Sequence, residues 1–185
     1  MINEINSAFL LRCYALLGII SKKPVTGYDV VRIFKQQMIY FWSTTHSQIY
    51  TESHKMENDN LIDHELVIQE VLPNKKVYSI TDTGKKELIR WAIEEPLKPA
   101  KIKDNFLIKS TIFPFLSVVE IIKLLDEVIE REEKILSMTK KWKEHFNSHE
   151  ERDVGAILTV EYGIRYSEMY LDWCKWAKQY INEIN

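Results

Sequence analysis

The feature that most constrains the fold is a long amphipathic segment in the second half of the chain. Ser117 is followed three residues later by Glu120, which is the spacing of a capping box at a helix start. From there an apolar stripe recurs at helical spacing as far as Phe146, with charged residues between its members. About thirty residues of helix would span roughly 45 Å, which is longer than a small domain is wide. Such a helix can bury its stripe only against a partner of similar length.

A second long helix follows and can supply that partner. We expect Ser148 to cap it, and one of its sides carries aromatic residues between Tyr162 and Trp173. A shorter helical stretch at 102–113, broken at Pro114, precedes both. The rest of the chain is too small to cover two such stripes, so antiparallel pairing extended by a second subunit is the expected arrangement. The residues predicted at the dimer interface are Ile122, Leu125, Ile129, Trp142, Ile164, Tyr166, Tyr170 and Trp173.

The first half of the chain opens with two shorter amphipathic helices. Apolar residues at helical spacing predict a helix over 7–21. Pro24 ends it, because the residue before a proline avoids helical geometry. Thr26 and Asp29 then form a second capping box, and the helix that they open is expected to run to about Tyr40.

A third helix and a change of sequence period come next. Thr45 and Gln48 again have the spacing of a hydroxyl cap with an amide at the third helical position. This helix is expected to stop near Asn60, a residue that tolerates the left-handed conformation. Beyond it, β-branched residues with partial alternation predict a strand within 61–71, and 75–80 is the returning strand.

The order of these elements predicts a winged helix-turn-helix. Pro73-Asn74 joins the two strands as a turn, and Thr81 can cap a fourth helix that ends near Glu95. In this arrangement the third helix enters a major groove of DNA and the hairpin lies beside it. We therefore expect a mainly α fold with a small β-hairpin. The predicted divisions are a winged-helix DNA-binding domain at 1–95, a linker at 96–101 and a helical dimerisation domain at 102–185.

Composition excludes several classes of protein. Hydrophobic residues make up 45% of the chain and charged residues 28%, which is ordinary for a soluble globular protein. No apolar run approaches the roughly 18 residues of a membrane-spanning helix, and the N-terminus lacks the cationic start of a signal peptide. Cys13 and Cys174 are expected to be separate reduced thiols, so the cytoplasm is the simplest location. The net charge of −2 shows no basic excess, so a case for DNA binding must rest on local arrangement.

A series of short motifs in the first half of the chain carries a family resemblance. The motifs are Ala15–Gly18, Gly27–Asp29, Phe41–Ser43, Ser47–Tyr50, Lys76–Thr81, Gly84, Leu88 and Trp91. In this order and spacing the chain resembles the PadR family of bacterial transcriptional regulators. The long-helix region is similar to the larger subfamily, which includes phenolic-acid-responsive repressors and AphA-type virulence activators. The resemblance implies a homodimer on a pseudo-palindromic operator and, in some members, an effector that is often a planar aromatic compound.

The chain departs from the family pattern along the third helix. Ser47 stands where a glycine is common, as in some phenolic-acid repressors, and Thr51 stands where the family usually has proline. Asn60 replaces a glycine expected near the end of the helix, and Glu52, Ser53, His54 and Lys55 stand where the family usually has leucine or basic residues. These changes are compatible with the fold and leave the operator sequence unpredicted.

The third helix and the hairpin carry the residues predicted to contact DNA. A helix N-terminus attracts phosphate, and short hydroxyls and a glutamine can reach base edges. The predicted contacts are Thr45, Ser47, Gln48, Tyr50, Thr51, Lys55, Lys75 and Lys76. Three simpler explanations stay open: Tyr50 belongs to the core, Gln48 serves only as a cap, and the lysine pair is ordinary surface. Acidic cover of this face also stays open, and the candidates for it are Glu52, Glu57, Asp59 and Asp63.

An effector site is predicted from a set of aromatic and basic residues. Arg12, Tyr28, His46 and Trp91 could line a pocket for an aromatic compound between the two domains. By resemblance, Tyr28 and His46 match positions close to the effector site of phenolic-acid repressors. The alternative is a histidine bonded to the backbone and a tyrosine that packs the domain. His145 and His149 are four residues apart, but a helix break is expected between them, so no metal site is predicted.

Three functional classes compete on the sequence. The winged-helix order and the motifs favour a DNA-binding regulator. The expected form is a repressor that a small aromatic effector releases from its operator. A protein-interaction module built on the same scaffold is the alternative, favoured by the neutral charge and the long helices. An enzyme has no support, because no nucleophile elbow, phosphate-binding glycine loop or pair of catalytic carboxylates is recognisable. No cofactor is expected.

Overall fold

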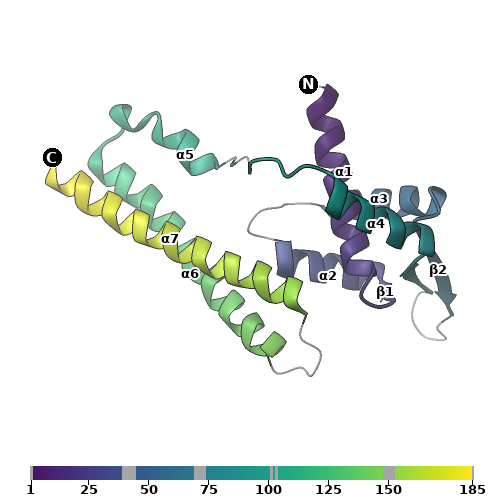
Figure 1. Cartoon of the computed structure of the whole chain (residues 1–185). Helices are drawn as coiled ribbons and strands as arrows, with labels where there is room; N and C mark the ends of the chain where they lie inside the picture. Colours follow the sequence, from purple (N-terminus) through teal and green to yellow (C-terminus); the bar gives the residue numbers. More distant parts are fainter. Residues whose placement is uncertain are drawn as a thin grey trace. The chain divides into compact units, whose positions relative to one another are not determined.

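The computed structural model describes residues 2–38, 45–68, 74–100, 102, 104–147 and 153–184. The chain divides into two compact units, Met1–Lys98 and Pro99–Asn185, which we call the head and the tail. Figure 1 shows the helices and strands of the head in purple to teal, and the two long helices of the tail in green and yellow. Each unit is described by itself.

The helices of the head occur in the predicted order. Their bounds are α1 (Ile2–Ile20), α2 (Gly27–Met38), α3 (His46–Asn58) and α4 (Asp82–Glu94). The start of α1 lies five residues before the predicted stretch 7–21. The predicted motif Phe41–Ser43, which precedes α3, lies outside the described residues. The predicted sequence of helix, helix, helix, hairpin and helix is therefore confirmed, with a longer first helix.

Local hydrogen bonds confirm the predicted helix starts. The hydroxyl of Thr26 donates to the Asp29 carboxylate at 2.7 Å and accepts from the Asp29 backbone N–H at 3.1 Å. Thr45 and Gln48 form both hydrogen bonds of a capping box at the start of α3. Thr81 caps α4 with its side chain. Each cap satisfies backbone N–H groups that the first turn of a helix leaves without partners.

An antiparallel sheet completes the head. Its strands β1 (Val25–Thr26), β2 (Ile62–Val67) and β3 (Lys75–Ile80) lie in the order β1-β3-β2. Strands β2 and β3 form the predicted hairpin, which we call the wing; the turn residue Pro73 lies outside the described residues. Strand β1 was not predicted, because two residues have no periodicity and only pairing with β3 defines them. The left-handed conformation expected at Asn60 is present, with φ at 57°.

The core of the head is apolar, and polar and aromatic side chains join α1 to α4. Its most buried side chains include Leu16, Leu17, Ile20, Phe34, Ile49 and Met56. The Tyr14 hydroxyl of α1 donates to Glu87 of α4 at 2.8 Å, and Arg90 donates to the same carboxylate at 2.6 Å. The bonds from Arg90 and Tyr14 lower the pKa of Glu87 to about 2. The ring of Trp91 stacks on Tyr14 with centroids 4.4 Å apart, so α1 and α4 are joined by polar and aromatic contacts.

The tail consists largely of two paired helices. Its elements are α5 (Asn105–Ser110), the 3₁₀ turn η1 (Phe113–Phe115), α6 (Val118–Asn147) and α7 (Val154–Glu183). Lys178 of α7 binds Asp126 near the start of α6, whereas Glu161 near the start of α7 binds Lys143 near the end of α6. These two ion pairs confirm that the two long helices are antiparallel. Ser117 and Glu120 form the predicted capping box of α6, with 2.7 Å between the hydroxyl and the carboxylate.

Two predicted boundaries in the tail are wrong. The helix expected over 102–113 is only the six residues of α5, and Pro114 lies within the following 3₁₀ turn. Proline has no N–H to continue the α-helical bonding pattern, so the chain leaves the helix before reaching it. The predicted cap Ser148 lies outside the described residues, and the N-cap of α7 is Asp153, which accepts from Ala156 N–H at 3.0 Å.

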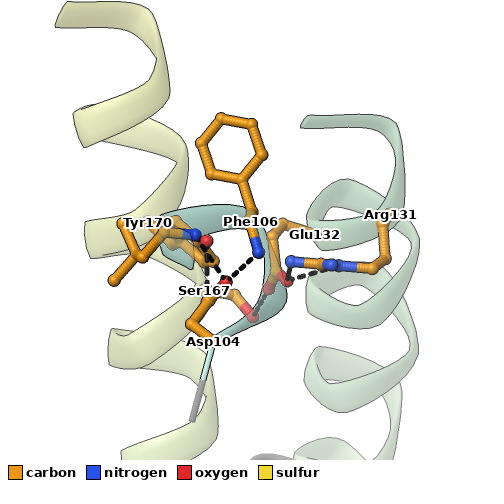
Figure 2. Close-up of polar contacts among 7 residues, drawn as sticks. Asp104, Phe106, Arg131, Glu132, Ser167 and Tyr170 are labelled. Atoms are coloured by element: carbon orange, nitrogen blue, oxygen red, sulfur yellow. Dashed lines mark hydrogen bonds and ion pairs between the residues drawn. The ribbon is translucent and has the colours of Figure 1, made fainter. Parts of the chain in front are cut away.

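Polar groups are built into the interface between α6 and α7 (Figure 2). The carboxylate of Glu132 on α6 accepts from the hydroxyl of Ser167 on α7 at 3.0 Å and from Arg131 at 3.0 Å. Asp104 caps α5 through Phe106 N–H at 2.7 Å and also accepts from the Tyr170 hydroxyl at 2.7 Å. One carboxylate thus joins α5 to α7 immediately after the linker region, and another joins α6 to α7.

The residues predicted at a dimer interface lie along this intramolecular contact. Leu125, Ile164 and Tyr170 are buried within the tail of a single chain. Ile122, Ile129, Tyr166 and Trp173 pack against the same core, and Trp142 is half-buried. Pairing of α6 with α7 accounts for the burial of these side chains without a second subunit, and their part in dimerisation stays a prediction.

Cys13 and Cys174 are free thiols, one in each unit. Burial raises the pKa of Cys13 to about 12 and that of Cys174 to about 11, so neither is a reactive thiolate near neutral pH. Among the described residues, none of the helices combines the length and apolar character needed to span a bilayer.

Candidate nucleic-acid interface

The helix predicted to read DNA, α3, has two chemically distinct faces. Its inner face contains Ile49, Glu52, Ser53 and Met56, all buried against the head. Its outer face is polar and exposed, and it carries most of the predicted contacts. The exposed residues of α3 and its cap include Thr45, His46, Ser47, Gln48, Thr51, His54 and Lys55. A helix that buries one face and presents hydroxyl, amide and basic groups on the other has the form needed to enter a groove.

The N-terminus of α3 is organised by its cap. The side-chain carbonyl of Gln48 accepts from Thr45 N–H at 3.1 Å, and the Thr45 hydroxyl accepts from Gln48 N–H at 3.2 Å. Gln48 therefore does serve as a cap, which was one of the two explanations left open for it. A contact between the same side chain and a base stays a prediction. Ser47 and Thr51 are exposed beside it.

Tyr50 lies between the core and the surface. Its side chain is 49% exposed, and its ring lies against the start of α2. A Cβ at Gly27 would come within 2.8 Å of the Tyr50 ring, so glycine at that position allows the close approach. The hydroxyl end of the Tyr50 ring packs against Gly27, and part of the side chain stays accessible. Its contact with DNA stays a prediction.

The acidic residues near α3 are placed differently from one another. Glu52 is 2% exposed and points into the head, so it does not cover the outer face. Burial raises the pKa of its carboxyl group, with Arg12 and Lys55 acting in the opposite direction. Asp59 and Asp63 are exposed. The carboxylate of Glu57 contacts basic side chains of α3 and of the wing.

The wing brings the predicted lysine pair next to the end of α3. Lys75 and Lys76 are both exposed at the start of β3. The Lys76 amine lies 3.5 Å from the Glu57 carboxylate, so it is attached to α3 rather than projecting alone. His64 of β2 contacts the same carboxylate. The sequence did not predict this ion-pair cluster, because it depends on how the hairpin folds back against the helix.

The residues predicted to hold an effector have different surroundings in the head. Tyr28 is 68% exposed at the start of α2, and His46 is exposed at the start of α3. Trp91 stacks on Tyr14. Among the described residues, Arg12 Nε is buried without a hydrogen-bond partner. An effector pocket that joins these side chains stays a prediction.

An open cavity of about 590 Å³ lies elsewhere in the head. It is bounded by α1, α3 and α4, and its lining includes Tyr14, Glu52, Met56, Glu87 and Arg90. The predicted effector residues do not line it. The part of the chain that the structure describes contains no group of three His, Cys, Asp or Glu side chains suited to a metal, and His149 lies outside that part.

Both units match known families. Residues 16–90 match the Transcriptional regulator PadR-like family, and residues 102–182 match the family described as Virulence activator alpha C-term. The two matched ranges fall in the head and in the tail, respectively.

Individual relatives extend the similarity over most of the chain. The negative transcriptional regulator PadR of Bacillus subtilis is 32% identical over 166 residues, which covers 86% of this chain and 91% of the relative. The crystal structure of that protein in complex with operator DNA has a TM-score of 0.78 and 31% identity, covering 93% and 99% of the two chains. Its structure in complex with p-coumaric acid has a TM-score of 0.69 and 28% identity, covering 91% and 97%.

Proposed function

The chain belongs to the PadR-like family of transcriptional regulators, and from this premise we propose that it represses transcription by binding an operator as a homodimer. Membership confirms the resemblance seen in the sequence and the prediction of a regulator rather than an enzyme. It also decides against the alternative of a protein-interaction module as the main function. The relative in Bacillus subtilis is a negative regulator, which supports repression as the direction of control.

The observation that carries the proposal is the exposed outer face of α3. Thr45 and Gln48 fix the start of the helix, and Ser47 and Thr51 lie exposed on its first turns. Hydroxyl groups there are short enough to contact base edges or phosphates without moving the helix away from the groove. The solved complex of the relative with operator DNA supports the same use of this fold.

The wing is proposed to contact the DNA backbone. Lys75 and Lys76 are exposed on β3 beside the end of α3, and a lysine near a phosphate adds affinity without reading sequence. Lys55, in the last turn of α3, is proposed to contribute in the same way. The chain has a net charge of −2, so these few local cations carry the electrostatic attraction to DNA.

The tail is proposed to form the dimer, and an outer stripe on α7 supports this. After α6 and α7 have paired, α7 still exposes apolar side chains at helical spacing along its length. They are Val154, Leu158, Tyr162, Met169, Trp176 and Tyr180. A stripe of this kind on a long helix is covered when a second copy packs against it. A dimer would also fix the distance between two copies of α3, as a pseudo-palindromic operator requires.

An aromatic acid is proposed as the effector. The support is the solved complex of the Bacillus subtilis relative with p-coumaric acid. Arg12, Tyr28, His46 and Trp91 stay the proposed contacts in this chain, because stacking and a charge-assisted hydrogen bond suit a planar anion. The ligand would release DNA by binding more tightly to a dimer in which the two α3 helices are wrongly spaced. Because the proposed target is chromosomal DNA, the cytoplasm is the proposed location.

Selection of DNA fragments by the full chain tests the function. Purified protein should enrich pseudo-palindromic fragments from genomic DNA, and phenolic acids added to the complex should release them. The double change of Ser47→Ala and Thr51→Ala should weaken binding to the selected operator by about tenfold or more and leave binding to random duplex nearly unchanged. Ser137→Ala, on the exposed surface of α6, is the control and should change neither affinity. Equal affinity for selected and random DNA in the unmodified protein would contradict the proposal.

A further inference from the structure

One carboxylate in the head gathers basic groups from three elements. Glu57 lies in the last turn of α3, and its side chain is 14% exposed. It contacts Nδ1 of His64 on β2, lies 3.5 Å from the Lys76 amine on β3, and lies 3.7 Å from Nδ1 of His54 on its own helix. The proposed DNA-reading helix and both strands of the wing therefore meet at one side chain.

The register of the wing explains why these groups converge. His64 is opposite Tyr78, and Leu66 is opposite Lys76. Alternate residues of a strand share a face, so His64, Lys76 and Tyr78 project from the same face of the hairpin. Tyr78 is buried in the core of the head, and its pKa is raised by burial and by Glu57. That face is the one turned toward α3, and Glu57 meets it at its edge.

A carboxylate at this position has an unfavourable effect on DNA binding when considered alone. Phosphates repel a negative charge held near them, and Glu57 stands beside a lysine proposed to bind phosphate. An acid at this position favours DNA binding only if its contacts to the wing raise the affinity for DNA by more than its repulsion of the phosphates lowers it. Partial burial and multiple partners hold this side chain in one place, unlike an isolated surface pair.

We propose that Glu57 is a positioning residue that fixes the wing against α3, so that Lys76 and the outer face of α3 meet one stretch of DNA at a set spacing. It acts through His64 and Lys76 and does not itself contact DNA. The inference rests on the proposed function and deepens it. It assigns part of the discrimination between operator and random DNA to a group that repels both.

Glu57→Gln should weaken binding to the selected operator without weakening binding to random duplex. The variant keeps the shape of the side chain but loses its charge, so the wing is less firmly held. Affinity for the selected operator should fall by about three- to tenfold, whereas affinity for random duplex should stay equal or rise by about twofold. Both are measured by titration of labelled DNA at about 50 and 200 mM salt.

Glu65→Gln is the matched control. Glu65 lies on β2, is exposed, and has no ion-pair partner within the described residues. Removing its charge should raise both affinities slightly and leave their ratio unchanged. If Glu57→Gln raises both affinities as Glu65→Gln does, Glu57 acts only as a repulsive surface charge and the proposal is overturned.

A second readout separates the positioning role of Glu57 from the proposed function and from misfolding. Hydrogen exchange of 62–67 and 75–80 should be about three- to fivefold faster in Glu57→Gln, whereas exchange of α1 should match the unmodified chain. Unchanged exchange in the wing overturns the positioning role of Glu57 even if DNA binding is lost. If exchange in the wing is faster but the unmodified protein selects no operator, the positioning role is supported and the proposed function is refuted instead. Faster exchange throughout the head assigns Glu57 to general stability and overturns the proposal.

Discussion

Among the residues that the structure describes, the head and the tail each bury one glutamate, and the two carboxyl groups have different partners. Glu132 of the tail is 4% exposed, and its carboxylate accepts hydrogen bonds from Ser167 and Arg131. Glu52 of the head is 2% exposed, yet no hydrogen bond reaches its carboxyl group from the described residues. Burial raises the pKa of Glu52, which marks an ionised form that the head holds at a cost.

This difference follows from how the two units are held together. Two long helices can slide or rotate against each other with little change in apolar burial, so a paired polar group in their interface fixes the register. The head has no such freedom, because its elements are joined by short connections and backbone contacts. The Thr81 hydroxyl donates to the Asn60 carbonyl at 2.7 Å, and Gly84 packs against the carbonyl of Leu61. The head can therefore tolerate an unpaired acid that would disturb the tail.

Gly84→Ala should have the largest effect on stability, because the added Cβ would clash with a neighbouring backbone carbonyl. A Cβ at this position would lie 2.0 Å from the Leu61 carbonyl oxygen and 2.9 Å from a side-chain carbon of Ile80. Backbone cannot rotate away as a side chain can, so we expect the free energy of unfolding of the head to fall by about 3 kcal/mol. Hydrogen exchange of head and tail peptides in the full chain would measure it.

The control for Gly84→Ala is Gly18→Ala in the last turn of α1. Nothing lies within 4 Å of a Cβ built at Gly18. The substitution should therefore stabilise the head by up to about 1 kcal/mol through helix propensity. Loss of stability in both variants, or in neither, would show that the glycine contact does not hold the head together.

How much of each unit could be predicted from the sequence depends on whether a feature is defined by neighbouring residues or by tertiary contacts. Helix starts at Thr26, Thr45, Thr81 and Ser117 were predicted correctly, because a side-chain cap is completed within four residues, whether as a capping box or, at Thr81, by the hydroxyl alone. Strand β1 was missed, since only its partner β3 defines it. In the tail, periodicity predicted the antiparallel helices but could not distinguish the stripe buried between them from the stripe that α7 leaves exposed.

The predicted DNA interface could likewise be found from the sequence only where its features are local. The outer face of α3 follows from its cap and its polar residues, which are local in the sequence. The burial of Glu52 could not be predicted, because a charged residue at an inward position breaks the apolar pattern of the helix. The meeting of Glu57 with His64 and Lys76 depends on tertiary contact between α3 and the wing. Neither property can be found from spacing along the chain.

Glu132→Ala should be the next largest change, and it tests whether the tail depends on its paired acid. The substitution leaves Ser167 without its partner and creates a void between the helices. The side chain of Arg131 is half exposed and can be hydrated, so the loss should stay near 2 kcal/mol for the tail. Glu130→Ala removes an exposed acid whose ion-pair partner among the described residues is Lys134, and it should leave the stability of the tail nearly unchanged. Chemical denaturation followed by hydrogen exchange of α6 and α7 distinguishes them, and equal losses would contradict the assigned role.

Tyr170→Phe should have a smaller effect in the same unit. It removes the hydrogen bond to Asp104 but keeps the ring in the core, so the tail should lose about 1 kcal/mol. Exchange should increase most in α5, which Asp104 caps and which this bond joins to α7. Tyr180→Phe is the control, because within the described residues its hydroxyl has no hydrogen-bond partner. An unchanged α5 in Tyr170→Phe would mean that other contacts hold that helix.

Glu52→Gln should give the smallest effect, and the expected sign is stabilising. A raised pKa in the folded head means that Glu52 favours folding when protonated, below its ordinary pKa, and that this contribution is lost as pH rises through the folded pKa. Glutamine stays neutral throughout, so it should add up to about 1 kcal/mol to the stability of the head at pH 7.5 and little at pH 4. Glu65→Gln, on the exposed face of β2, should show no such dependence on pH. Urea denaturation at both pH values measures the difference between the variants. If Glu52→Gln destabilises the head at pH 7.5, the attraction of Arg12 and Lys55 outweighs the cost of burial, and the two buried glutamates are paired alike after all.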